Sequence, residues 1–389
     1  MMLSAAEYSL VAVIVSAVVV VCIPAIRRPT GYLALEFIVA AIVYQNQLFG
    51  YLLWIAVWFA AARVIENLTP VEAKLGKKRW TYACAAMIAV VAIFFAGSMH
   101  LLDWVSIRAF GVLWTLPDHD MWLLLRTITF LWETGSGRLK KLDFIDYAIW
   151  ITFPFTLLGP LIRPSEFYPQ YGRAESEQAL TRVVDSKWWG KLMLALAQMT
   201  IGAGLIWATN ALDRMGRHWP QAIVLFGTAP WSMYLSSAGL FHLMECLAVF
   251  WAIELPSSFN YPFGQPNISE FWARWNMTIV RVCRDYLFYN RWGFKRVNMY
   301  LNLLIVFLAV GLWHSIAWFW GIWGLLHGIG FCVYLWYRSN KEKFAAVREI
   351  GSERQRDLLS RATTYVFVCW VNYFAVKLAI PINRLMGAR

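Results

Sequence analysis

Apolar stretches and short polar segments alternate along almost the whole chain. Six stretches, at about residues 8–25, 82–102, 192–212, 299–315, 316–337 and 363–380, each predict a membrane helix because they have the length of a span, roughly 17–25 residues. Residues 221–236 and 238–254 predict two more spans. Residues 31–65 are too long for one span, and the polar centre from Tyr44 to Gln47 predicts two short helices in its place.

One interrupted stretch and two polar segments complete this pattern. Residues 147–161 are apolar but short and contain two prolines and a glycine, which predicts a re-entrant segment instead of a span. Residues 163–191 and 338–361 are polar and charged, and we expect both on the cytoplasmic side. The sequence therefore predicts an all-α integral membrane protein, a polytopic bundle of about 9–11 membrane helices and re-entrant half-helices. We expect one domain over residues 1–389.

Composition supports a membrane protein and excludes a nucleic-acid-binding one. Hydrophobic residues make up 60% of the chain and aromatic residues 17%, whereas ordinary globular domains are roughly 45–50% apolar. The net charge of +12 comes from Lys and Arg in short runs between apolar stretches, as in cytoplasmic loops of membrane proteins. We therefore expect a multi-pass protein of the cell inner membrane that contacts membrane lipids and no nucleic acid. No cleavable signal peptide is expected, because no basic region precedes the first apolar stretch.

Two polar residues stand out in the apolar C-terminal half, Asn276 in FWARWN and His314 in GLWHS. A polar or ionisable group inside a membrane segment is costly, so each is a functional hypothesis. His327 in WGLLHG is a second histidine candidate. On a continuous helix the two histidines would lie about 20 Å and about 140° apart. Only one could then act at a given centre unless a glycine breaks the helix, and its position slightly favours His314.

Residues 267–288 predict one amphipathic helix. Asn267, with Glu270 three positions later, resembles a capping box that starts the helix. On a helical wheel Asn276 is the one strongly polar residue on the apolar face, and the arginines lie on the other face. Such a helix suits a membrane interface or the wall of a wet funnel. A hydrogen bond between helices is an equally good interpretation of Asn276.

Neither cysteine spacing nor histidine positions predict a metal site. The six cysteines form no Cys-x-x-Cys pair. His119 lies between two aspartates, but three neighbours on an extended loop cannot all face one ion. His100 and His218 also fall near predicted loops, and His242 with Glu245 predicts a buried structural pair. We therefore expect no metal and no bound cofactor.

Several sequence blocks resemble the membrane-bound O-acyltransferase family. FNYPF, NISEFWARWN, RDYLF and GLWHS followed by WGLLHG appear in the order that this family shows. FPFTLLGPLIRPSEFYPQ resembles its bacterial members, and FLWETGSG does so more loosely. Together the blocks cover roughly residues 125–330.

The resemblance implies that His314 is catalytic and that Asn276 assists it. It also implies a bundle around a central tunnel, which a thioester donor enters from the cytoplasm. The donor would be an acyl carrier protein or coenzyme A, and the acceptor a hydroxyl on the other side of the membrane or in the lipid. A neutral imidazole would take the proton of that hydroxyl. Arg274, Arg281 and Arg284 could hold the phosphates of the donor, or could lie along the interface with their charges in water.

The expected activity is transfer of an acetyl or D-alanyl group to an extracytoplasmic glycan or envelope polymer. Bacterial polysaccharide-acylating members usually carry His where this chain has Asn276, and Asn is more typical of lipid-acylating branches. A lipid or small-molecule hydroxyl is therefore the alternative acceptor. A membrane transporter with a polar-lined path is an alternative of a different class, although the two halves show no matched pair of interrupted helices.

Overall fold

A computed structural model describes most of the chain, in thirteen ranges: residues 5–23, 29–67, 76–98, 107–109, 112–114, 120–139, 142–157, 159–171, 185–214, 219–288, 298–314, 318–344 and 351–385. Its contacts divide the chain into two compact units. Unit 1 contains residues 1–191 and 243–256, and unit 2 contains residues 192–242 and 257–389. The single integral-membrane domain expected from the sequence stays a prediction.

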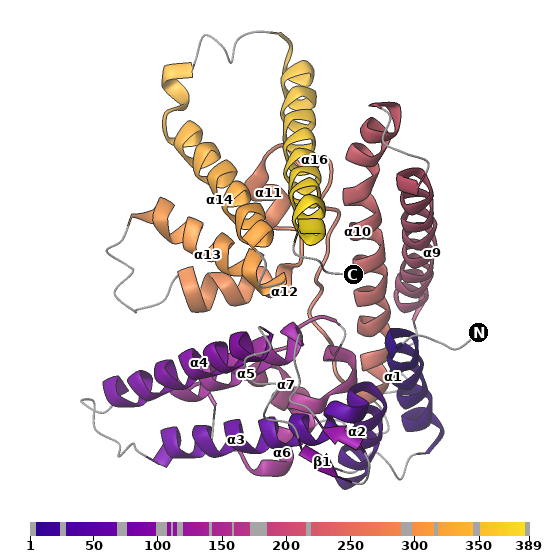
Figure 1. Cartoon of the computed structure of the whole chain (residues 1–389), viewed down its shortest axis with the longest axis vertical. Helices are drawn as coiled ribbons and strands as arrows, with labels where there is room; N and C mark the ends of the chain where they lie inside the picture. Colours follow the sequence, from indigo (N-terminus) through magenta and orange to yellow (C-terminus); the bar gives the residue numbers. More distant parts are fainter. Residues whose placement is uncertain are drawn as a thin grey trace. The chain divides into compact units, whose positions relative to one another are not determined.

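Unit 1 is a group of short and medium helices with one small hairpin (Figure 1). Its elements in chain order are α1 (Ala5–Cys22), α2 (Pro29–Tyr44), η2 (Gln45–Gln47), α3 (Leu48–Asn67), α4 (Gly76–Ser98), β1 (Ile107–Ala109), β2 (Val112–Trp114), α5 (Met121–Gly135), α6 (Phe144–Thr152), η3 (Pro154–Thr156) and α7 (Pro164–Tyr171). The η4 turn (Val249–Trp251) belongs to it as well. Strands β1 and β2 pair antiparallel, with Arg108 opposite Leu113. Apart from this hairpin the fold is all-α, as predicted.

The polar centre predicted between two short helices is present. Helix α2 ends at Tyr44, the η2 turn covers the next three residues, and α3 begins at Leu48. Gln45 has a φ of 44°, a left-handed conformation that interrupts the α-helical hydrogen-bond pattern. The α-helix is therefore interrupted there, and Tyr44 on one side of the turn stacks on Tyr51 on the other, with ring centroids 3.8 Å apart.

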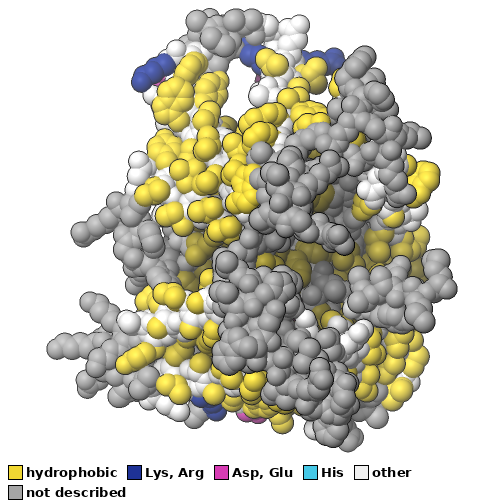
Figure 2. Space-filling view, viewed as in Figure 1, with side chains coloured by type: hydrophobic (Ala, Val, Ile, Leu, Met, Phe, Trp, Pro, Cys, Tyr) yellow, Lys and Arg dark blue, Asp and Glu magenta, His cyan; other side chains and the backbone are white. Residues whose placement is uncertain are grey.

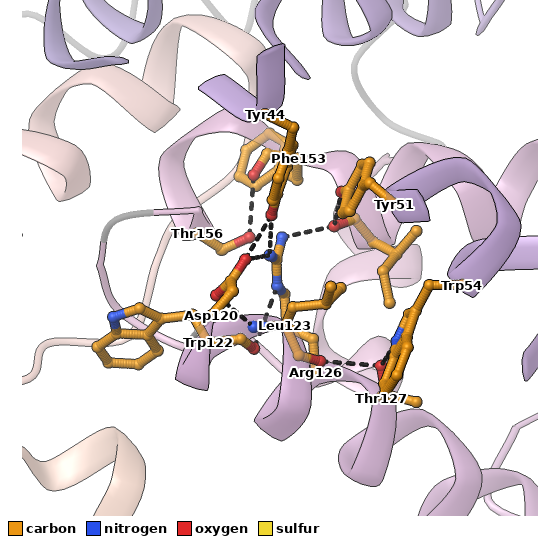
Figure 3. Close-up of polar contacts among 11 residues, drawn as sticks. Tyr44, Tyr51, Trp54, Asp120, Trp122, Leu123, Arg126, Thr127, Phe153 and Thr156 are labelled. Atoms are coloured by element: carbon orange, nitrogen blue, oxygen red, sulfur yellow. Dashed lines mark hydrogen bonds and ion pairs between the residues drawn. The ribbon is translucent and has the colours of Figure 1, made fainter. Parts of the chain in front are cut away.

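A buried arginine, Arg126, belongs to a network of polar contacts in the core of unit 1 (Figure 3). The guanidinium of Arg126 on α5 donates to the carbonyl of Ile151 on α6 and lies 3.9 Å from Asp120. The Tyr44 hydroxyl donates to the same carboxylate at 2.5 Å, and the Tyr51 hydroxyl donates to the carbonyl of Ile151 at 3.3 Å. A buried cation is tolerated where counter-charge and acceptors surround it. This network joins α5 and α6 to the end of α2, through Tyr44, and to the start of α3, through Tyr51.

The segment predicted to be re-entrant is folded as short pieces. Helix α6 ends at Thr152, the η3 turn follows, and α7 starts at Pro164. The Glu133 carboxylate accepts hydrogen bonds from the backbone N–H of Ser165 at 2.9 Å and from its hydroxyl at 2.8 Å. The Thr152 hydroxyl donates to the buried Glu36 carboxylate at 2.7 Å. These side chains attach the segment to α5 and α2.

Unit 2 holds the longer helices and the site. Its elements are most of α9 (Ser186–Arg214) and α10 (Trp219–Ala248), followed by α11 (Ile268–Trp272), α12 (Met277–Val282), the π-helix η5 (Cys283–Phe288), α13 (Met299–His314), α14 (Trp318–Ser339), η7 (Lys341–Phe344) and α16 (Glu353–Leu385). Helix α14 packs against both α13 and α16 (Figure 1).

The prediction of two spans within residues 221–254 is wrong, because α10 is one helix through this region. The Ser236 hydroxyl donates to the carbonyl of Ser232 at 2.8 Å, so this polar residue satisfies its side chain within the helix. The helix also contains Pro230. The serine at the predicted boundary and Pro230 are therefore both accommodated inside one continuous helix.

Two glycines allow α13 and α14 to approach closely. A Cβ atom on Gly311 would collide with the carbonyl oxygen of Trp320, and one on Gly324 would collide with the carbonyl oxygen of Phe307. The two glycine Cα atoms therefore face each other across the pair. Two helix backbones can approach each other this closely only where the facing residues have no side chain, as glycine does.

The structure confirms a helical protein with membrane-length apolar helices. Among the described residues, four helices are long and apolar enough to cross a membrane: Leu48–Asn67, Ser186–Leu212, Ile223–Trp251 and Trp318–Ser339. Shorter apolar helices accompany them, and Figure 2 shows hydrophobic side chains over much of the face in view. Lys and Arg gather near the top of that view, by the ends of α14 and α16. The total of 9–11 membrane helices stays a prediction.

Candidate active site

The segment that carries Asn276 is not the single helix predicted for residues 267–288. Its start is as expected, because Asn267 caps α11 by accepting from the backbone N–H of Glu270 at 2.9 Å. Helix α11 ends at Trp272, however, and α12 begins only at Met277. Asn276 lies at the break with φ 41° and ψ 55°, a left-handed conformation.

Backbone hydrogen bonds from a distant segment explain this break. The N–H of Asn260 donates to the carbonyl of Arg274 at 3.0 Å, and the N–H of Met277 donates to the carbonyl of Ser258 at 2.7 Å. These bonds replace the helical bonds that the segment would otherwise make. Asparagine adopts the left-handed conformation at lower cost than most residues, because its short polar side chain bonds locally. Here the Thr278 hydroxyl donates to Asn276 Oδ1 at 3.3 Å.

Asn276 and His314 line one cavity of about 570 Å³ within unit 2. The walls are mostly apolar and aromatic, and include Trp272, Trp275, Met277, Ile279, Val280, Cys283, Phe288, Leu303, Val306, Phe307, Val310, Trp313, Phe331 and Leu335. Elements α11, α12, η5, α13 and α14 all contribute to them. The structure therefore brings together the two residues that the sequence singled out.

His314 is the last residue of α13 and is surrounded by indoles. Its imidazole stacks on Trp320 with centroids 4.9 Å apart and planes at 21°, and meets Trp323 edge-on at 5.3 Å and 83°. Trp313 lies 4.8 Å away on the third side. Trp320 and Trp323 are three apart in the sequence, a spacing that places both on one face of α14 and that could have indicated an aromatic surround.

His314 and His327 do not lie on one continuous helix, the case considered from the sequence, but on the two helices predicted for residues 299–315 and 316–337. Helix α13 ends at His314, and His327 lies on the separate helix α14, which packs beside α13. Both imidazoles contact Trp323, at centroid distances of 5.3 and 4.7 Å. His327 is 1% exposed and does not line the cavity. The geometry therefore favours His314 for contact with substrate.

The three arginines differ in position. Arg281 and Arg284 line the cavity, and Arg284 Nε also lies 2.8 Å from the carboxylate of Asp285. Arg274 is not among the lining residues and lies 3.8 Å from Glu270. Two of the three predicted donor-binding arginines thus lie on the same cavity as His314.

Among the described residues, His242 is the one remaining histidine discussed from the sequence, and it does not line this cavity. His242 Nδ1 lies 2.8 Å from Gln198 Oε1, and the Glu245 carboxylate forms an ion pair with Lys191. His100, His119 and His218 lie outside the described residues. Within the described part of the chain, no group of three or more His, Cys, Asp or Glu side chains could hold a metal ion.

Comparison with curated proteins finds relatives of this chain. A peptidoglycan O-acetyltransferase of Helicobacter pylori is 31% identical over 259 residues, which cover 63% of this chain and 46% of that protein. A teichoic acid D-alanyltransferase of Bacillus subtilis is 29% identical over 282 residues, 66% of this chain and 69% of the relative. A protein of Pseudomonas putida named "Probable alginate O-acetylase" is 24% identical over 244 residues, 60% of this chain and 49% of the relative.

The chain is similar to these three proteins, which are named as an O-acetyltransferase, a D-alanyltransferase and a probable O-acetylase. No family model matches it. The chain spans about half the length of two of these three relatives, 46% and 49%. Asn276 and His314, the two residues to which the sequence motifs point, lie on one cavity.

Proposed function

We propose that this chain transfers an acyl group, acetyl or D-alanyl, from a thioester donor on the cytoplasmic side to a hydroxyl of an extracytoplasmic envelope polymer. We further propose that it does so as a multi-pass protein of the cell inner membrane. One observation carries the proposal: Asn276, His314 and two arginines line a single apolar cavity. The kinship to acetyl- and D-alanyl-transferring relatives supports the reaction class.

His314 is the general base in this scheme. Its neutral imidazole takes the proton of the acceptor hydroxyl as the oxygen attacks the thioester carbonyl carbon. The new C–O bond forms, the C–S bond breaks, and the thiolate leaves and takes up the proton from the imidazolium. Such general-base catalysis contributes about 10²–10⁴-fold to the rate. The stacked Trp320 and the edge-on Trp323 hold the His314 ring in place against the cavity wall.

Asn276 stabilises the negative charge that develops on the carbonyl oxygen. The Thr278 hydroxyl donates to Asn276 Oδ1, which leaves the amide N–H groups as donors. A donor placed at an oxyanion is worth about 10²–10³-fold in rate. Two backbone hydrogen bonds flank Asn276, from the Met277 N–H to the Ser258 carbonyl and from the Asn260 N–H to the Arg274 carbonyl. They hold the left-handed backbone of Asn276, so the amide is preorganised before substrate arrives.

Arg281 and Arg284 bind the phosphates of the donor arm. Guanidinium groups recognise phosphate oxygens through paired N–H donors, and both arginines lie on the cavity that holds His314. The donor is a thioester of coenzyme A or of a cytosolic acyl carrier protein, and no bound cofactor takes part. The acceptor is a glycan or other envelope polymer, because the similar proteins are named for peptidoglycan, teichoic acid and alginate. A lipid or small-molecule hydroxyl is the alternative acceptor, favoured by Asn at position 276.

A reconstituted assay tests this function. The purified protein in liposomes is given radiolabelled acetyl coenzyme A or D-alanyl carrier protein, with peptidoglycan fragments, lipoteichoic acid or alginate as acceptor. We expect ester-linked label on one polymer with the wild-type chain and none with His314→Ala, at equal thermal stability. Transport of label into the liposomes without ester formation would support the transporter alternative instead. Retained transfer by a folded His314→Ala protein would exclude His314 as the base.

A further inference from the structure

His327 is a buried imidazole with unsatisfied polar atoms. It is 1% exposed, and neither Nδ1 nor Nε2 has a hydrogen-bond partner within the part of the chain that the structure describes. Leaving a buried polar group without a partner costs about 1–3 kcal/mol. An apolar side chain of similar volume would fill the same space without that cost. A polar group kept in such a place points to a functional requirement.

The rings around His327 connect the two parts of the candidate site. Its imidazole is perpendicular to the indole of Trp272, with centroids 5.0 Å apart, and lies 4.7 Å from the indole of Trp323 at 70°. Trp272 ends α11 and lines the cavity on the segment that leads to Asn276. Trp323 contacts the imidazole of His314. His327 therefore lies between the indole of Trp272, which shares the cavity wall with Asn276, and the indole of Trp323, which contacts His314.

The backbone around His327 permits this central position. Gly324 and Gly328 lie on either side of it in α14 and face α13, where a Cβ on Gly328 would come within 3.1 Å of Phe307 Cβ. Helix α14 can thus approach α13 closely enough for Trp323 to contact His314 while His327 contacts Trp272. The third ring against His327 is Phe367 of α16, at 5.8 Å and 87°.

We propose that His327 is a positioning residue that holds Trp272 and Trp323 and thereby sets Asn276 relative to His314. This inference rests on the proposed acyl transfer. Perpendicular aromatic pairs are worth about 0.5–1.5 kcal/mol beyond burial, and an imidazole N–H directed at an indole face adds a weak hydrogen bond that an apolar side chain lacks. A misplacement of about 1 Å between catalytic groups can cost about 100-fold in rate.

The test compares His327→Leu with His327→Gln in the liposome assay. Leu has a similar volume without polar atoms, and Gln retains a planar N–H donor. For His327→Leu we expect kcat to fall about 10–100-fold, with the KM of the donor unchanged within about twofold and an unfolding temperature no lower than that of the wild-type chain. We expect His327→Gln to recover part of the lost kcat. A residue that served only packing would show no such recovery.

His242→Phe is the matched control, because His242 is a second buried imidazole in unit 2 that has a partner, Gln198. We expect this variant to unfold at a lower temperature with kcat per folded molecule unchanged, the opposite of the result for His327→Leu. If His327→Leu keeps kcat within twofold, or loses kcat only in proportion to folded protein, the positioning role is wrong. If the wild-type chain transfers no acyl group, the proposed function itself has failed.

Discussion

Asn276 and His314 lie on the wall of one cavity, although Asn276 interrupts a pair of short helices and His314 ends a long one. A left-handed backbone at Asn276 and a helix end at His314 both place a polar side chain where a regular helix would have continued. Non-glycine residues with positive φ are uncommon and tend to occur at functional sites. Each polar side chain thus lies at an irregularity in the backbone, so its chemical role can be tested separately from the role of its backbone conformation.

Two variants of Asn276 should distinguish the role of its side-chain amide from the role of its left-handed backbone conformation. We expect both Asn276→Ala and Asn276→Gly to lose about 10²–10³-fold in kcat, because both remove the donor to the oxyanion. Only the alanine variant should also be less stable, by about 1–2 kcal/mol, because glycine accepts a φ of 41° and alanine does not. Kinetics and thermal unfolding of the two variants check this. An active glycine variant would show that Asn276 serves only the turn.

Arginine variants should report on donor binding. We expect Arg281→Gln and Arg284→Gln each to raise the KM of the donor about tenfold, the loss of one charge-assisted bond of about 1.5 kcal/mol, with little change in kcat. Arg274→Gln is the matched control on the same segment, since Arg274 lies 3.8 Å from Glu270 and does not line the cavity. Steady-state kinetics with varied donor measure the effect. If all three variants kept the wild-type KM for the donor, these arginines would lie along the interface without holding phosphate.

Glycine variants should test the close packing of α13 and α14. We expect Gly311→Ala and Gly324→Ala each to lower the free energy of unfolding by about 1–3 kcal/mol, because a methyl group would collide with a backbone carbonyl on the other helix. Gly190→Ala on α9 is the control, since nothing lies within 4 Å of the added Cβ. That change should stabilise the helix by about 0.5–1 kcal/mol. Unfolding in a denaturing detergent measures all three, and a destabilised Gly190→Ala would contradict the packing argument.

Arg126 should be far more important for stability than a surface arginine. We expect Arg126→Met to cost about 3–5 kcal/mol, because it leaves Asp120 and the carbonyl of Ile151 without their buried cation. Arg63→Gln should cost less than about 1 kcal/mol, since the Arg63–Glu66 pair at 2.8 Å is partly exposed. Thermal unfolding of both variants measures the two losses of stability. Combining Arg126→Met with Asp120→Asn should recover part of the loss, and a double variant no better than the single one would contradict the charge argument.

Local patterns along the chain were enough for several features. The polar Tyr44–Gln47 centre predicted the break between α2 and α3, and the Asn267–Glu270 spacing predicted the start of α11. These features depend on interactions between residues only a few positions apart, and such interactions can be inferred from the local sequence. The boundary between α13 and α14 was also predicted close to its observed place.

Features that depend on distant segments were not predicted. The wheel for residues 267–288 assumed that each backbone group bonds within its own helix, whereas Arg274 and Met277 bond to the segment around Ser258. The contact of both His314 and His327 with Trp323 was not predicted either, because it depends on α14 packing against α13.

Hydropathy and hydrophobic periodicity are local properties of a chain, so they were enough to predict an apolar, helical membrane protein with Asn276 and His314 as its conspicuous polar residues. The three-dimensional fold was needed to show that these two residues line one cavity, and that Arg281 and Arg284 line it while Arg274 does not. It was also needed to show that His327 lies outside the cavity lining, between two indoles. These relations arise from hydrogen bonds and close helix packing between segments far apart in the sequence. Their partners cannot be identified from any one segment alone.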